Sequence, residues 1–374
     1  MEKDNMESAK STLTREAPSH TAADAKLQVA MVGCGGISEH YMRALAGIGR
    51  VAVVAAVDVR EDTLAHFQQR HHVAQGFSDY KKMLSSIHPD VVCVCTPNLL
   101  HAPVSIAALE AGAHVITEKP MALSPDECEL MIKTARQMKR KLGVGFQYRF
   151  HPATQMLKRA ADMGQFGPVM LVRCQAMRRR GMPNWGVFGQ KKLQGGGPLI
   201  DIGVHVMEMA HYVMGSPRPI HASGNIWTFA GNRPNDVPCM WPGWNWQSHD
   251  IEDLAVGQIR FDNGAVMQVE ASFIAHIEKD QWNFQLSGSR GGAAWDPPQI
   301  FTNHAGTMVN ITPAYLPTMD FDGLFTAKLE NFVQAVLDDA PLEAPAEAGL
   351  AIQEMIDGIY RSAAAGREVD IPAR

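Results

Sequence analysis

The segment MVGCGGIS, residues 31–38, decides the fold of the N-terminal half of the chain. It closes an apolar run, LQVAMVG (27–33), that predicts a buried strand, and it opens ISEHYMRALAGI (37–48), which predicts an amphipathic helix. The first glycine permits a tight turn, and the second lets the backbone approach a pyrophosphate, whose charge a helix N-terminus stabilises. The Gly-x-Gly-x-x-Ser pattern therefore predicts a dinucleotide-binding loop whose cofactor contacts are Gly33, Gly35, Gly36 and Ile37.

The second predicted strand, VAVVAAVD (51–58), ends in Asp58, a further expected cofactor contact. A carboxylate at this point accepts hydrogen bonds from the ribose hydroxyls and repels a 2′-phosphate, which favours NAD over NADP. Arg60 keeps NADP open, because a nearby guanidinium can bind a phosphate. A glycine-rich turn without a cofactor is the alternative, and the strand–loop–helix context argues against it.

Short apolar runs alternate with helical patterns as far as residue 150, which is typical of βαβ units on a parallel sheet. A helix is predicted to begin at Ser124, with Pro125 in its first turn. We therefore predict an α/β fold in which residues 27–150 form a doubly wound, NAD(P)-binding Rossmann domain. Its predicted strands are 27–33, 51–58, 90–97, 113–120 and 142–150.

Two short motifs follow predicted strands of this domain, TPNLLH (96–101) and EKP (118–120). Ligands bind beyond the carboxyl ends of such strands, so these side chains are expected to face the cofactor. His101 could instead be a helix-start residue near its own backbone, and a strand-end lysine could simply be exposed. The expected cofactor contacts are Thr96, Pro97, Asn98, His101, Glu118 and Lys119.

After Pro152 the pattern changes to one helix, about 153–164, followed by alternating segments. An Asn-Gly pair in FDNGAV (261–266) predicts a hairpin turn. Residues 151–374 are therefore predicted to form an α+β substrate and oligomerisation domain with a large open, mainly antiparallel sheet. Its closing helices, about 322–339 and 345–363, are free to pack back on the Rossmann domain. The predicted strands are 168–178, 219–229, 251–261, 265–275, 281–288 and 306–312.

Four polar residues follow three glycines in GGGPLIDIGVHVMEMAH, residues 195–211. At helical spacing Asp201 and His205 lie one turn apart on one face, so they could be a proton-transfer pair. A metal site made with Glu208 is disfavoured, because one straight helix rarely directs three adjacent turns at one ion. We expect Glu208 and His211 to be outer-face or packing residues, and the glycines to let the backbone turn closely past a substrate.

Composition excludes several classes of protein. The 374 residues carry a formal charge of −5, which gives no reason to expect a nucleic acid or an anionic membrane as partner. No apolar run reaches the roughly 18 residues of a membrane span. Residues 1–26 are polar and are interpreted as a flexible tail rather than a secretory signal. The six cysteines are scattered without zinc-site spacing, as expected for reduced thiols in a cytoplasmic protein.

Taken in order, the motifs GCGGIS, TPNLLH, EKP, YRFHP and GGGPLIDIGVH resemble those of the Gfo/Idh/MocA family. The resemblance extends from about residue 27 to the C-terminus. It implies NAD(P)-dependent oxidation or reduction of a sugar, cyclitol or related polyol, and a C-terminal sheet that pairs subunits into a homodimer or homotetramer. It also implies that Lys119, Asp201 and His205 are the catalytic residues.

These three residue types suit hydride transfer from a secondary hydroxyl. His205 can accept the hydroxyl proton at neutral pH, Asp201 can orient the imidazole or hold an adjacent hydroxyl, and Lys119 can stabilise the alkoxide. With an unperturbed pKa near 6.5, His205 predicts that oxidation slows as the pH falls toward 6. Arg149 and Trp185 are expected to contact substrate together with Asp201 and His205. Substrate stacking and packing both remain open for Trp185, Trp241, Trp244 and Trp246.

Two other functions remain open from the sequence. Some relatives retain NAD and use a transient oxidation to eliminate a glycosidic substituent, which is redox-neutral overall. A dinucleotide-binding protein without turnover is the other alternative, and the combination of Lys119, Asp201 and His205 argues against it because a pure binder needs no base.

Overall fold

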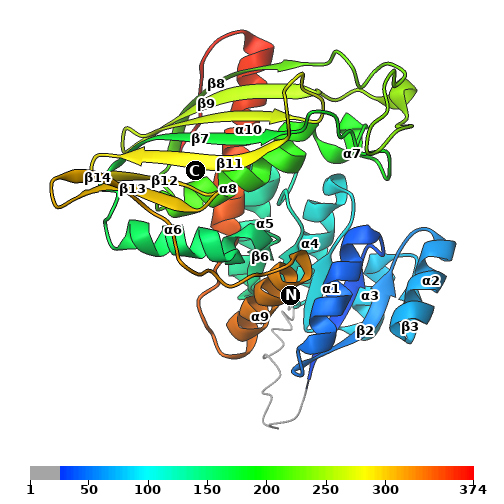
Figure 1. The fold of residues 1–374 in the computed structure, drawn as a ribbon. Helices are drawn as coiled ribbons and strands as arrows, with labels where there is room; N and C mark the ends of the chain where they lie inside the picture. Colours follow the sequence, from blue (N-terminus) through cyan, green and yellow to red (C-terminus); the bar gives the residue numbers. More distant parts are fainter. Residues whose placement is uncertain (1–25) are drawn as a thin grey trace, which may run out of the picture.

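The structure of the chain is a computed structural model that describes residues 26–374. The expectation of a flexible tail falls on residues 1–26, and all but the last of these lie outside the described residues. Two β-sheets stand one above the other in Figure 1, a six-stranded sheet from the first half of the chain and a nine-stranded sheet from the second. This arrangement confirms the predicted α/β fold.

The six-stranded sheet is parallel throughout and has the order β3-β2-β1-β4-β5-β6. Strand β1 (Leu27–Val32) pairs with β2 (Val51–Val57) on one side and β4 (Val91–Val94) on the other. The order therefore reverses at β1, and ligands of doubly wound sheets bind in the crevice at such a reversal. The other strands are β3 (Gln75–Phe77), β5 (His114–Thr117) and β6 (Leu142–Val144).

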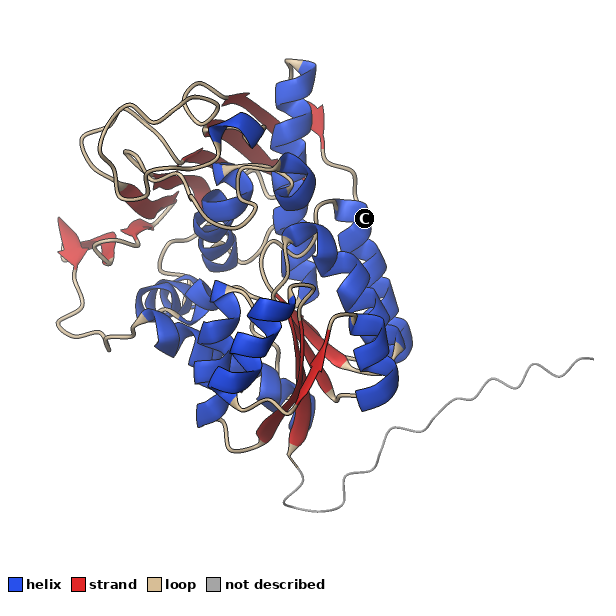
Figure 2. Ribbon diagram, turned by 90° about the vertical axis from the view of Figure 1, so that its right-hand side faces the viewer, coloured by secondary structure: helices blue, strands red, loops and turns tan. Residues whose placement is uncertain are grey.

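Helices cover both faces of this sheet, as the edge-on view in Figure 2 shows. Helix α5 begins as the sequence predicted: the Ser124 hydroxyl accepts a hydrogen bond from the Glu127 N–H at 3.3 Å, and Pro125 occupies the first turn. The helices of this half are α1 (Gly36–Gly47), α2 (Glu61–His71), α3 (Tyr80–Ile87), α4 (His101–Glu110) and α5 (Pro125–Met138).

The nine-stranded sheet has the order β14-β13-β12-β11-β7-β10-β9-β8-β15 and is antiparallel except between β7 and β10. The predicted hairpin joins β9 to β10 through Asn263 and Gly264, whose φ is +86°. The strands are β7 (Val169–Met177), β8 (Pro219–Trp227), β9 (Leu254–Phe261), β10 (Val266–Ser272), β11 (Gln281–Gly288), β12 (Gly291–Ala294), β13 (Gln299–His304), β14 (Thr307–Ile311) and β15 (Val369–Asp370).

Helices pack on one face of this sheet and leave the other face open. Alternating burial along β9 and β10 agrees with one covered and one open face. The covering helices are α6 (Pro152–Asp162), α8 (Val204–Val213) and α10 (Ala346–Ala365), and the short helix α7 (Lys191–Gln194) lies near one end of the sheet.

Helix α9 (Phe321–Leu337) crosses from the second half of the chain to the first and packs against α1 (Figure 1). Its buried residues Phe325, Leu329 and Phe332 belong to the same apolar cluster as residues of β1 and α1. Arg43 of α1 also donates to the Asp322 carboxylate at 2.9 Å. A C-terminal helix thus completes the outer layer of the N-terminal sheet.

Two local predictions are corrected by the structure, and three strands were missed. The strand expected at 142–150 ends at Val144, and the short helix η2 (Gln147–Phe150) follows it. A π-helical turn, η3 (Leu199–Gly203), precedes α8 where a regular helix was expected. The glycine-rich and short strands β3, β12 and β13 were not predicted. No helix among residues 26–374 is long and apolar enough to cross a membrane.

Candidate active site

The loop after β1 leaves an open cradle. A Cβ added to Gly33, whose φ is +93°, would lie 2.5 Å from the Cys95 carbonyl oxygen, so only glycine permits this turn. At Gly35 and Gly36 an added Cβ meets no protein atom within 4 Å, and both residues are exposed. The Ser38 hydroxyl donates to the Gly35 carbonyl at 2.6 Å and holds the loop in this shape.

Asp58 lies beside this cradle, directly after β2. One carboxylate oxygen accepts from the Cys34 N–H at 3.0 Å, and the other accepts from the Arg60 N–H at 2.9 Å. Each carboxylate oxygen can accept more than one hydrogen bond, so acceptor capacity remains for a ribose. The Thr96 hydroxyl at the end of β4 is buried without a hydrogen-bond partner among residues 26–374. The cradle, the carboxylate and this hydroxyl fit a dinucleotide.

Two of the expected cofactor contacts bind protein instead. His101 is fully buried, and its two ring nitrogens lie 2.6 Å from the Pro120 carbonyl and 2.9 Å from the Thr96 carbonyl. The imidazole therefore joins the two motif loops, and the cofactor contact expected of His101 stays a prediction. Asn98 donates to the Gln194 carbonyl at 2.9 Å and links the short helix η1 (Asn98–Leu100) to α7.

The Glu118 side chain also points away from the cradle into the protein. It accepts from the Tyr41 hydroxyl at 2.8 Å and from the Lys328 ammonium at 2.9 Å. Lys328 comes from α9, is 2% exposed, and lies over the rings of Tyr41 and Phe325 at 4.3 and 3.9 Å. This buried ion pair gives the Glu118 carboxylate a structural role, and its expected contact with the cofactor stays a prediction.

Lys119 and Asp201 join the two halves of the chain. The Lys119 ammonium donates to the Asp201 carboxylate and to the Asp201 backbone carbonyl, each at 2.9 Å. Lys119 follows β5, and its peptide bond to Pro120 is cis, whereas Asp201 stands in the π-helical turn η3. The two side chains are 16% and 17% exposed, so the pair is partly accessible to solvent. Two motifs 82 residues apart thus meet in one contact.

His205 lies one turn beyond Asp201 and is 7% exposed. Its ring packs edge-on against Tyr148 at a centroid distance of 5.1 Å and at a tilt of 50° against Trp282 of β11 at 5.9 Å. Burial lowers the pKa of His205 well below its usual value, and the charges of Lys119, Lys328 and Arg178 lower it further. The imidazole is therefore neutral at physiological pH and able to accept a proton.

Arg178 is a functional candidate that the sequence analysis missed. It follows β7 directly, its charge acts on both Asp201 and His205, and its own pKa is lowered, chiefly by burial. The basic run RRR at 178–180 was the only signal, and it gave no reason to separate Arg178 from its neighbours. Tyr148 and Trp282 were likewise missed as the aromatic wall beside His205.

Glu208 and Arg149 form a buried ion pair on the inner side of α8. The Arg149 guanidinium also donates to the Glu343 carbonyl at 2.6 Å and lies 4.6 Å from the Tyr212 ring. These contacts favour a structural role for Arg149 over the expected substrate contact. They also turn Glu208 away from Asp201 and His205, so the three-ligand metal alternative is not assembled.

His211 and the glycines before the helix pack against other parts of the protein and do not lie on an outer face. His211 is 1% exposed and lies 2.8 Å from the Pro217 carbonyl. A Cβ at Gly196 would lie 2.1 Å from the Tyr360 hydroxyl, and one at Gly197 would lie 2.2 Å from the Glu252 carbonyl. The glycines thus make room for neighbouring protein, which corrects the expectation that they face substrate.

Of the four tryptophans left open between stacking and packing, one is buried and three are exposed or half-buried. Trp244 is buried and donates to the Gly231 carbonyl at 2.8 Å, so it packs the loop. Trp185 is 48% exposed and meets Trp241 edge-on at a centroid distance of 4.8 Å. Trp246 lies exposed on the short helix η4 (Trp246–Ser248).

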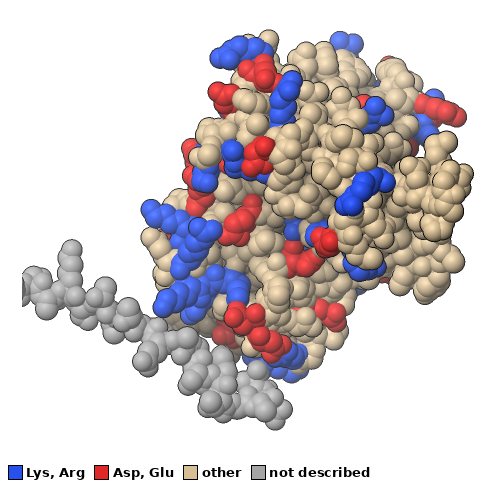
Figure 3. Space-filling view, turned by 90° about the vertical axis from the view of Figure 1, so that its left-hand side faces the viewer, with Lys and Arg blue, Asp and Glu red and all other residues tan. Residues whose placement is uncertain are grey.

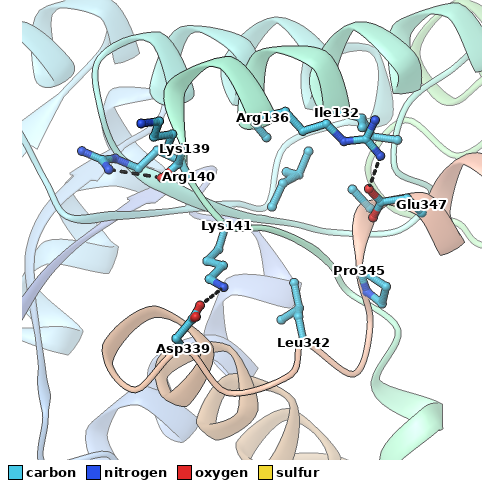
Figure 4. A pocket seen from close by; sticks show the side chains of 12 residues that line it. Ile132, Arg136, Lys139, Arg140, Lys141, Asp339, Leu342, Pro345 and Glu347 are labelled. Atoms are coloured by element: carbon cyan, nitrogen blue, oxygen red, sulfur yellow. Dashed lines mark hydrogen bonds and ion pairs between the residues drawn. The ribbon is translucent and has the colours of Figure 1, made fainter. Parts of the chain in front are cut away.

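A separate cavity of about 390 Å³ lies between the end of α5 and the loop from α9 to α10. Its basic side chains are largely paired: Lys141 binds Asp339 and Arg136 binds Glu347 (Figure 4). Figure 3 shows acidic and basic side chains intermixed over one face of the molecule, not a continuous basic surface. Neither feature resembles a nucleic-acid site.

The open cradle, the Lys119–Asp201 contact and the neutral His205 together define a two-domain, NAD-binding oxidoreductase. The family model described as "Oxidoreductase family, NAD-binding Rossmann fold" matches residues 27–146, and "Oxidoreductase family, C-terminal alpha/beta domain" matches residues 158–371. The chain therefore belongs to the Gfo/Idh/MocA family of oxidoreductases. This confirms the resemblance stated from the motifs.

Individual relatives agree with this assignment. The chain is 32% identical over 348 residues to D-glucoside 3-dehydrogenase of Escherichia coli (strain K12), which covers 92% of this chain and 97% of the relative. It is 29% identical over 259 residues to levoglucosan dehydrogenase of Pseudarthrobacter phenanthrenivorans, covering 64% and 63%. The solved structure of a levoglucosan dehydrogenase with NADH shares the fold, with a TM-score of 0.81 at 23% identity over 93% of this chain and all of that one.

Proposed function

We propose that the chain is an NAD-dependent dehydrogenase that moves a hydride between a secondary hydroxyl of a sugar, glycoside or cyclitol and nicotinamide. The observation that carries this proposal is the contact of Lys119 with Asp201 at 2.9 Å, one helical turn from a neutral, buried His205. An ammonium and a base beside a nucleotide cradle are what alcohol oxidation requires. The names of the relatives support a carbohydrate substrate.

The cofactor would be held by the cradle at Gly33, Gly35, Gly36 and Ile37, with Asp58 toward the ribose. NAD supplies the hydride acceptor when it is bound. The Asp58 carboxylate would repel a 2′-phosphate, which favours NAD over NADP. Thr96 and Pro97 follow β4 at the same edge of the sheet, and the buried Thr96 hydroxyl has no hydrogen-bond partner among residues 26–374, which supports a contact with the nucleotide.

In the proposed mechanism His205 accepts the proton of the substrate hydroxyl. No residue between 26 and 374 forms a hydrogen bond with its imidazole, so the ring is free for substrate. The Lys119 ammonium stabilises the developing alkoxide, and Asp201 holds that ammonium in place rather than orienting the imidazole. In this proposal the domain of residues 27–150 binds the cofactor and the domain of residues 151–374 binds the substrate.

The test is NAD reduction followed at 340 nm with a panel of glucosides, free sugars and inositols. We expect stoichiometric NADH with at least one of them, and a loss of about 100-fold or more in kcat for Lys119→Ala and for His205→Ala. A redox-neutral enzyme would consume a glycoside without net NADH. Unchanged catalysis in both variants would refute the assigned roles.

We further propose that the open face of the nine-stranded sheet pairs two chains. A shallow cavity of about 180 Å³ on this face is lined by polar side chains that include one residue of each charge: Arg173, Gln175, Gln268, Glu270, Asn283 and Gln285. Sedimentation equilibrium tests this: a dimer or tetramer supports it, and a monomer at micromolar concentration excludes it.

The free cysteines, five of the six buried, fit the expected cytoplasmic location.

A further inference from the structure

We propose that Trp185 and Trp241 form a stacking subsite for a ring that the substrate carries beside the sugar being oxidised. This inference rests on the proposed function and deepens it: the substrate would be a glycoside whose substituent is a flat ring. The shared chemistry is an apolar ring face, offered either by an aryl aglycone or by the C–H face of a second sugar.

Trp185, which is exposed, and Trp241, which is half-buried, form an aromatic platform built from separate loops. Trp185 is 48% exposed, and its ring stands edge-on to Trp241 at 89° and edge-on to Phe188 at 5.9 Å. The rings of Trp185, Phe188 and Trp241 contact one another and so form a contiguous apolar patch. Contiguous exposed patches, unlike single exposed side chains, mark binding sites. Tryptophan faces are suited to this because they bury a large apolar area with few rotatable bonds.

The loops that carry the platform are tied to each other, so the platform is formed before any ligand arrives. The Asn184 side chain donates to the Pro242 carbonyl at 2.7 Å, next to both tryptophans in sequence. Arg180 also binds Asn235 and Asp236 of the segment that leads to Trp241. A preformed surface loses little conformational entropy on binding.

Arg178 connects the platform to the proton-handling pair. Its guanidinium lies 5.0 Å from the Trp241 ring and 5.4 Å from the Phe273 ring, and it donates to the Gly181 carbonyl at 2.8 Å. The same positive charge acts on Asp201 and His205. Arg178 also follows Ala176 and Met177 of β7, and Ala176 pairs with Trp282 of β11, whose ring lies 5.9 Å from the His205 ring. The platform therefore lies toward the end of β7 that adjoins the aromatic wall beside His205.

The test compares kcat/KM for methyl β-glucoside, phenyl β-glucoside and cellobiose in the wild type and in Trp185→Ala. We expect the preference for phenyl over methyl glucoside to fall about 5- to 10-fold in the variant, mainly through KM, because an aromatic pair contributes about that factor. Trp227→Ala is the matched control: this tryptophan is 43% exposed on β8 and lies outside the proposed subsite. The preference for phenyl over methyl glucoside should be the same in Trp227→Ala as in the wild type.

Each outcome decides the proposal. A selective loss for cellobiose in place of phenyl glucoside identifies the second ring as a sugar. An equal loss for all three substrates, or a changed oligomer mass in Trp185→Ala, overturns the subsite and identifies a packing or subunit contact. If no glucoside, free sugar or inositol reduces NAD, the proposed function fails. Equilibrium binding of phenyl and methyl glucoside to the NADH-loaded protein then tests the subsite alone, because a ring-independent affinity would overturn it.

Discussion

At the scale of single residues, the environment of His205 determines how the site responds to pH. Burial and three neighbouring cations disfavour the imidazolium, and the largest of these effects is burial. The nearby Asp201 carboxylate does not offset them, because it is paired with Lys119 at 2.9 Å. A base held neutral in this way remains available below the pH at which a solvated histidine would be protonated.

We therefore revise the pH dependence expected from the sequence. Because the pKa of His205 is lowered, oxidation should remain on its plateau at pH 6 and decline only at lower pH. Arg178→Gln removes one of the cations that lower this pKa, so its acidic limb should move to higher pH. The measurement is kcat/KM from pH 4.5 to 8 for both proteins, with Arg260→Gln, which alters an exposed ion pair, as control. A wild-type limb centred at 6.5 would contradict this account of His205.

The sequence predicted some side chains of the site and not others for a definite reason. The motifs contain an ammonium, a carboxylate and an imidazole, which are residue types that indicate proton transfer: Lys119, Asp201 and His205. The structure brings the first two into contact. For His101 and Glu118 the motif gave the position at a strand end but not the direction of the side chain. Buried carbonyls and Lys328, 210 residues away from Glu118, determine that direction. Local sequence carries no signal for such a distant partner.

At the scale of elements, α9 is the helix whose packing the sequence left undetermined. Its apolar periodicity predicted a helix at about 322–339, but periodicity does not identify the surface that the apolar face meets. The structure places it on α1, where Lys328 reaches Glu118. The π-helical turn η3 was also beyond prediction, because residues 199–213 are buried on nearly all sides and have no single apolar face whose shift would reveal an extra residue. Asp201 lies within that turn.

The Lys328–Glu118 pair should behave as a buried ion pair that tolerates joint but not single replacement. Lys328→Met leaves the Glu118 carboxylate buried without its cation, which should cost about 3–5 kcal/mol of unfolding free energy. Replacing Glu118 by Gln in the same chain removes the uncompensated charge and should recover a large part of that loss. Urea unfolding of both single variants and the double variant measures the coupling. Strictly additive losses would show that the two side chains do not depend on each other.

At the scale of the whole molecule, the site exists only where the two sheets meet. The cradle and Lys119 come from the first sheet, Asp201 and His205 come from the helix under the second, and Asn98 bonds to Gln194 across the same junction. The two sheets and their order of appearance followed from alternating patterns that are local in sequence. Their relative placement depends on contacts between distant segments, so the sequence predicted the two halves and not the junction.

Buried neutral histidines in both halves of the molecule should make the fold sensitive to acid. Burial lowers the pKa of His101, His205 and His211, and for His211 the value falls to about 4. A group whose pKa is depressed on folding stabilises the fold above its unfolded pKa, near 6.5 for histidine, and this stability is lost as the pH falls. His211 alone should cost about 2 kcal/mol between pH 7.5 and pH 5.

His211 allows this acid sensitivity to be tested without touching the proposed chemistry. Its ring stacks on Phe261 at 5.8 Å and bonds to the Pro217 carbonyl, on the inner side of α8. His211→Gln keeps a donor for that carbonyl and cannot be protonated, so it should flatten the pH dependence of the unfolding free energy between 7.5 and 5. Chemical unfolding at four pH values measures the slope, with exposed His304→Gln as control. A slope equal to that of the wild type would mean that the charge on His211 is accommodated in the folded state.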